Sequence, residues 1–226
     1  MNRISSVIKM HSKDKWSWFI IPWLVMLSSF FINFAISAFV DTPIYTGGVS
    51  SIYIYMFVAG IITLAQTFPF ALGIGVSRTD YYIGTSTMVL LTSIGSALVL
   101  FLLSLTEVWT GSWGTGLHFF HLPYYSDGPL INQFLVPLVI LLLMHFTGVL
   151  ISALYRRTGK NGLFLISGIL LIAFTVLGFL ITYLNWFDPI YKWIVRQTAV
   201  DYTLWMLPFI VVFASASYLL LRKATV

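Results

Sequence analysis

Six long, uninterrupted apolar segments constrain this chain more than any other feature of its sequence. Each is about 20 residues long, the length that an α-helix needs to cross about 30 Å of hydrocarbon. None shows the alternation of polar and apolar residues that marks the strands of a membrane barrel. The segments therefore predict membrane-spanning helices. They cover residues 16–40, 51–74, 84–105, 134–154, 163–184 and 203–221.

The composition favours an integral membrane protein. Hydrophobic residues make up 59% of the 226 residues and charged residues only 8%, whereas soluble domains carry about 25% charged residues. Six spans fill most of a chain of this length, so we expect one all-α membrane domain over residues 1–226 and no soluble enzyme domain. The chain has no cysteine, which excludes disulfides, thiol catalysis and cysteine metal sites.

The basic residues predict the orientation of the chain, because Lys and Arg near span ends favour the cytoplasmic side. With a cytoplasmic N-terminus, ten of the 12 basic residues fall inside and only Lys192 and Arg196 fall outside. Acidic residues show the opposite bias. We therefore expect both termini in the cytoplasm. The net charge of +5 then reflects topology, and no basic stripe with interleaved aromatic residues predicts nucleic-acid binding.

One polar stretch, LGIGVSRTDYYIGT at residues 72–85, separates the second and third spans. Gly73 and Gly75 can end a helix, since glycine adopts left-handed backbone conformations without strain. Ser77 and Asp80 have the spacing of a capping box at the start of the next helix. We expect a short, rigid element that presents Arg78 and aromatic side chains to the cytoplasm. The simpler interpretation is a capped turn whose arginine anchors it at the lipid headgroups.

The residues ALGIGVSRTDYYIGT after the second span resemble the first cytoplasmic loop of small ABC-2 type permeases of Gram-positive bacteria, and the six-span layout is similar to theirs. The resemblance implies a permease in the bacterial plasma membrane, among membrane lipids, paired with itself or a similar permease. It implies no cofactor in this chain but a separate cytoplasmic ATPase, with ATP and Mg, that drives efflux of a hydrophobic or peptide-like substrate.

In that family the loop is a coupling helix that rests in a groove of the ATPase. The resemblance therefore implies contacts from Ser77, Arg78, Thr79, Asp80, Tyr81 and Tyr82. Thr79 stands where a second basic residue is expected, which leaves Arg78 as the electrostatic partner of the ATPase.

Two flanking segments fit the same layout. Residues 1–15 place Ile4, Val7, Ile8 and His11 on one helical face, which predicts an interfacial helix and resembles the family's N-terminal connecting helix. An ordinary basic tail next to the membrane is the alternative. Residues 185–202 mix aromatic and charged residues and look like the external re-entrant helices of ABC-2 exporters, or form an aromatic belt at the outer headgroups.

The sequence offers little catalytic chemistry. It lacks a GxxxxGK[ST] phosphate loop, so we expect no ATP site and no enzyme activity in this chain. His118 and His121 lie in the long outer loop with Glu107 and Asp127 nearby in sequence, but a third metal ligand at helical spacing is missing. We therefore predict no metal site.

Polar residues inside the spans are candidates for a transport path, since exposing them to lipid is costly. Asn33, Gln66 and His145 are the main ones, although each can simply hydrogen-bond a neighbouring helix. Pro69 can kink the second span and leave a carbonyl unpaired. Two other functions stay open: a non-transporting membrane scaffold or sensor that binds a cytoplasmic protein, and a small channel, which the lack of a regular polar face on any span disfavours.

Overall fold

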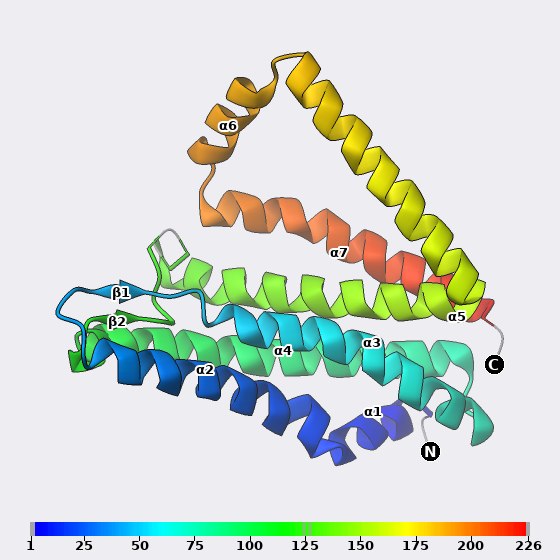
Figure 1. Cartoon of the computed structure of the whole chain (residues 1–226). Helices are drawn as coiled ribbons and strands as arrows, with labels where there is room; N and C mark the ends of the chain where they lie inside the picture. The colour runs from blue at the N-terminus through cyan, green and yellow to red at the C-terminus, as the bar shows by residue number, and fades with distance from the viewer. Residues whose placement is uncertain (1–2, 124, 127, 225–226) are drawn as a thin grey trace.

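The computed structural model describes residues 3–123, 125–126 and 128–224 and shows an all-α membrane protein (Figure 1). Five of its helices are long and apolar enough to cross a membrane. In chain order, the elements are α1 (Arg3–Lys13), the π-helix η1 (Trp16–Ile20), α2 (Ile21–Ser37), β1 (Ile44–Tyr45), α3 (Ser50–Gly73), α4 (Arg78–Trp109), the 3-10 helix η2 (Ser112–Gly114), β2 (Leu117–His118), α5 (Leu130–Tyr183), α6 (Phe187–Arg196) and α7 (Ala199–Arg222).

The first, second, third and sixth apolar segments correspond to separate helices, but the fourth and fifth share one helix. Both lie in α5, whose 54 residues correspond to about 80 Å of helix at 1.5 Å per residue. The break expected over residues 155–162 is reduced to Gly159, which has φ 69° and ψ −173°. Glycine tolerates this conformation because it has no Cβ. The two halves of α5 consequently run in different directions (Figure 1).

The helices α2, α3, α4, α7 and the first half of α5 lie roughly along one direction and form a bundle (Figure 1). Gly60 of α3 and Gly148 of α5 face each other, and a Cβ on Gly148 would overlap the backbone of Phe57. Small residues at such crossings let membrane helices approach closely. The close α3–α5 crossing is therefore fixed by two glycines.

The two ends of the bundle differ in chemistry. We call the end with the α3–α4 turn, Gly159 and the last turn of α7 the arginine end; the first and last described residues, Arg3 and Ala224, also lie there (Figure 1). We call the opposite end, with β1, β2 and η2, the loop end. There β1 pairs in parallel with β2, with Ile44 opposite Leu117.

The N-terminal helix α1 packs on α4 at the arginine end. Val7 and His11 are buried, which confirms the predicted face for these two residues. This face contacts protein instead of lipid, because Gly84 of α4 leaves room for the Val7 side chain: a Cβ on Gly84 would lie 2.7 Å from the Val7 Cβ. Whether α1 lies at the membrane interface stays a prediction.

The second half of α5 and helix α6 leave the bundle and return to it at the start of α7 (Figure 1). Large apolar side chains are exposed around the second half of α5, for example Phe164, Leu171 and Phe179. A helix that is apolar all round suits contact with hydrocarbon. The aromatic segment at residues 185–202 contains the short helix α6.

Candidate functional site

The turn between α3 and α4 has the geometry that its glycine predicts. Gly75 has φ 83°, and the amide of Val76 donates to the carbonyl of Ala71 at 3.0 Å while the amide of Gly75 donates to that of Leu72 at 3.0 Å. This pattern is a Schellman motif, which satisfies the last carbonyls of α3. Gly73, by contrast, is the last residue of α3 and does not need a left-handed conformation.

The start of α4 is capped as the Ser77–Asp80 spacing predicts. The Ser77 hydroxyl oxygen accepts from the backbone amide of Asp80 at 3.1 Å, and the hydroxyl donates to the Asp80 carboxylate at 2.7 Å. The carboxylate therefore binds the Ser77 side chain, whereas a full capping box would use the backbone amide of Ser77. Such a cap contributes about 0.5–2 kcal/mol to helix stability.

Arg78 does not extend freely into the cytoplasm as expected. Its Nη1 donates to the carbonyl of Arg222, the last residue of α7, at 3.0 Å. A cation at this position also complements the negative end of the α7 dipole. Arg78 thus holds the end of α7 against the start of α4, and its side chain is half-buried.

The expectation that Tyr81 and Tyr82 face the cytoplasm is wrong, because both side chains are buried between helices. The hydroxyl groups of Tyr81 and Thr67 of α3 are 2.7 Å apart, and the Tyr82 hydroxyl donates to the carbonyl of Ala214 of α7 at 2.6 Å. A buried tyrosine is stable there because its hydroxyl finds a partner. The side chains exposed at this turn are instead Ile74, Ser77 and Thr79.

Two further arginines at this end also bind backbone carbonyls. Arg157 donates to the carbonyl of Lys223, beyond the end of α7. Arg156 donates to the carbonyl of Ala65 in α3, four residues before Pro69. Proline has no N–H with which to bond that carbonyl, so Arg156 replaces the missing donor. The sequence indicated the unpaired carbonyl, but it did not indicate which residue would bind it.

The three polar residues predicted for a transport path do not form one site. The Asn33 side-chain amide donates to the carbonyl of Ser29 in its own helix at 2.8 Å. His145 is completely buried, and neither ring nitrogen has a hydrogen-bond partner in the described part of the chain. Its ring stacks on Trp18 of the π-helix, with centroids 5.4 Å apart.

Gln66 lines a hollow between the π-helix and α3, which we call the side groove. Its volume is about 280 Å³, close to the lower bound of about 300 Å³ for small-molecule pockets. Asp14, Ser17 and Thr63 contribute further polar groups, and Trp18 forms part of the wall. Trp18 lines the groove with Gln66 and also stacks on His145.

A hollow of this size accommodates part of a small molecule, with the remainder outside on the open side. Its wall carries both polar and apolar groups, so the groove can accommodate an amphipathic ligand.

At the loop end, a central position belongs to Glu107, for which the sequence indicated only nearness to the histidines. Glu107 is 1% exposed, and its carboxylate accepts from the backbone amides of Phe119, Phe120 and His121 at 2.8–3.2 Å. The indole Nε1 of Trp113 donates to it at 3.1 Å. The carboxylate therefore organises the loop after α4, and only its position just before a glycine-rich segment could have suggested this.

The two histidines of the loop after α4 have separate partners. The His118 ring stacks on Tyr45, with centroids 4.5 Å apart, and its Nδ1 lies 3.7 Å from Glu107. The Nδ1 of His121 lies 3.1 Å from the Ser104 hydroxyl. Within the described residues, no group of three or more His, Asp or Glu side chains could hold a metal ion. Asp127 lies outside the described residues.

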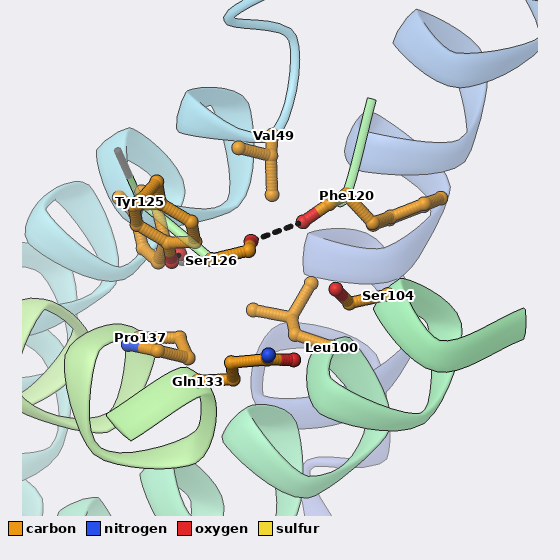
Figure 2. Close-up of a pocket in the computed structure, with 9 residues that line it drawn as sticks. Val49, Leu100, Ser104, Phe120, Tyr125, Ser126, Gln133 and Pro137 are labelled. Carbon is orange, nitrogen blue, oxygen red and sulfur yellow. Dashed lines mark hydrogen bonds between the residues drawn. The ribbon is translucent and has the colours of Figure 1, made fainter. Parts of the chain in front are cut away.

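A small cavity lies beside this loop, and Figure 2 shows Tyr125, Ser126, Gln133 and Leu100 around it. The Ser126 hydroxyl donates to the carbonyl of Phe120 at 3.4 Å. The cavity measures about 10 Å³, which is no more than the space of a single water. It is therefore too small to bind a substrate.

Comparisons of the chain with profiles of known protein families, with curated proteins and with solved structures give no match.

Proposed function

We propose that the chain is the membrane permease subunit of an ATP-binding cassette exporter of the ABC-2 type. The observation that supports this proposal most is the turn between α3 and α4, which is rigidly held and has exposed side chains at its tip. A separate cytoplasmic ATPase would bind ATP and Mg and contact Ile74, Ser77 and Thr79. A second copy of this chain, or a similar permease, would complete the transporter in a bacterial plasma membrane.

The turn is bonded to the helices around it, which suits a coupling element. Tyr81 binds α3, whereas Arg78 and Tyr82 bind α7. A force on the turn would therefore move α3, α4 and α7 together, since packed elements shift as bodies instead of deforming continuously. In this proposal Arg78 and Asp80 hold the turn in place, and the exposed side chains make the contact.

The proposal includes six crossings, with both termini in the cytoplasm. The two halves of α5 would then be separate spans joined at Gly159. Because the chain has no native cysteine, single cysteines at Asp41, Thr158, Asp188 and Lys223, all exposed, report the topology with a membrane-impermeant maleimide on intact cells. We expect labelling at positions 41 and 188 only. Labelling at position 158 or 223 would contradict the topology.

The ATPase contact is tested by charge placed on the exposed tip of the turn. Ile74 is 63% exposed at the arginine end, and Val108 is 56% exposed near the loop end, so the two are matched. We expect Ile74→Asp to lower recovery of a nucleotide-binding subunit with the tagged chain about tenfold, because it places an unpaired charge in the contact. Val108→Asp should leave recovery unchanged. Quantitative mass spectrometry of complexes purified from the native host measures both.

Two results would contradict the proposal. Equal recovery from Ile74→Asp and Val108→Asp would remove the turn from the contact. Recovery of no nucleotide-binding subunit with the unmodified chain would leave the scaffold or sensor function, in which the same turn binds a cytoplasmic protein without ATP turnover.

A further inference from the structure

The side groove owes its shape to the π-helix that begins the first span. Trp16–Ile20 form a wider turn than an α-helix does, and such bulges are frequent at functional sites. Trp18 is 5% exposed and lies between His11 and His145, with centroid distances of 5.0 and 5.4 Å. Its ring therefore forms a fixed wall, and the Tyr55 hydroxyl bridges to the opposite wall by donating to the carbonyl of Ser17 at 2.9 Å.

The lining of the groove changes from polar to apolar along its length. Asp14 lies before the first span and Gln66 lies in the last two turns of α3, so both are toward the arginine end. Ile21 of α2 and Val58 and Ile62 of α3 follow in the direction of the loop end. Because α2 and α3 run in opposite directions, the gradient is the same on both walls.

Two polar side chains in this groove have unused hydrogen-bonding capacity. The Gln66 amide has no hydrogen-bond partner in the described part of the chain, although it lies within a span. One Asp14 oxygen accepts from the Ser17 amide at 3.2 Å, and the carboxylate has no ion-pair partner among the described residues. Both groups are exposed, so a ligand can reach them.

We propose that the side groove binds a membrane lipid whose headgroup carries an ammonium group. The ammonium would lie against the Asp14 carboxylate and donate to the side-chain oxygen of Gln66. Its acyl chain would lie against Ile21, Val58 and Ile62. A carboxylate favours a cation and disfavours a headgroup that is only anionic, which selects the ammonium class among lipids.

The groove opens toward the membrane, which makes a lipid the occupant instead of a soluble amine. Val58 and Ile62 are 39% and 44% exposed on its open side, and apolar side chains at this depth in a span face hydrocarbon. The groove is large enough for the headgroup and the first part of an acyl chain, and the rest of the lipid remains in the bilayer. The lipid site lies within one chain and does not depend on the ATPase contact.

Native mass spectrometry of the purified full-length chain tests the inference with equimolar phosphatidylethanolamine and phosphatidylglycerol. We expect preferential retention of phosphatidylethanolamine. Asp14→Asn should reduce this retention about twofold to fivefold, the change expected on losing an exposed ion pair. Asp188→Asn, an exposed acid on α6, is the matched control and should have no effect.

A second variant tests the site without removing charge. Ala59→Phe places a ring in the groove and should reduce phosphatidylethanolamine retention to the level of phosphatidylglycerol, with thermal unfolding measured to show that the variant is folded. Equal retention of the two lipids by the unmodified chain, or unchanged retention in Asp14→Asn, would overturn the inference and indicate annular lipid only. Complete displacement of the lipid by soluble phosphoethanolamine would overturn the membrane source of the ligand.

Discussion

The two ends of the bundle satisfy backbone polar groups with side chains of opposite charge. At the loop end, the Glu107 carboxylate accepts from the amides of Phe119, Phe120 and His121. At the arginine end, Arg78 and Arg156 donate to carbonyls of α7 and α3. An acid therefore binds a loop that needs acceptors, and bases bind helix carbonyls that need donors.

The two arrangements differ in burial, and burial determines what each interaction contributes. Glu107 is almost completely buried, so removing its carboxylate leaves several N–H groups without water or protein partners. Arg78 and Arg156 are half-buried, so water can replace part of what they supply. The loop end therefore depends on one side chain, whereas the arginine end is supported by several.

The largest expected effect is at the loop end. We expect Glu107→Leu to lower the free energy of unfolding by about 3–5 kcal/mol, because a buried charged network loses its centre. Glu107→Gln should lose less, since its amide oxygen still accepts. Thermal unfolding in detergent measures both. Asp41→Leu, which changes an exposed acid near the same end, is the control, and an equal loss there would show that Glu107 has no special role.

The second prediction separates the Arg156 hydrogen bond from general packing. Arg156→Met should lower the free energy of unfolding by about 1–2 kcal/mol, because the Ala65 carbonyl loses its donor. In a Pro69→Ala background the same change should cost less, since residue 69 then supplies an N–H to that carbonyl. A double-mutant cycle measures the difference. Equal costs in the two backgrounds would show that Arg156 acts through its packing on Phe68, whose ring centroid is 5.7 Å away.

The smallest expected effect on stability concerns His11, a buried side chain with one hydrogen-bond partner, whereas Glu107 has several. His11 contacts the Thr85 hydroxyl at 3.0 Å, and burial lowers the pKa of His11 from 6.5 to about 4, although the charge of Asp14 raises it in part. The unfolded chain therefore takes up a proton as the pH falls through about 6.5, while the folded chain does not until about 4. Stability is present above this window and is lost as the pH falls within it.

The corresponding measurement is the free energy of unfolding at about pH 7 and about pH 5.5. His11 should contribute a loss of about 1 kcal/mol between these values. His11→Gln should remove that part of the pH dependence, whereas His121→Gln at the loop end serves as the control. An unchanged pH dependence in His11→Gln would show that His11 is protonated without cost in the folded chain.

The sequence alone determined the membrane class, most of the helices and the α3–α4 turn. These features follow from local causes: a long apolar run needs a helix in hydrocarbon, a glycine takes a left-handed turn, and Ser77 caps the helix that begins beside it. The basic residues around Gly159 favour a loop between two spans. In the structure these residues are helical on both sides of Gly159.

Only the tertiary structure decided which partner each polar side chain finds. Arg78 binds a carbonyl 144 residues away, and Tyr82 binds one 132 residues away. No local pattern therefore predicts that the Arg78 side chain is bound to α7 or that the Tyr82 side chain is buried. The side groove combines Asp14, which lies between α1 and the π-helix, with Gln66 of α3. The physical reason is that helix formation depends on neighbouring residues, whereas the burial and pairing of a polar group depend on which helices pack together.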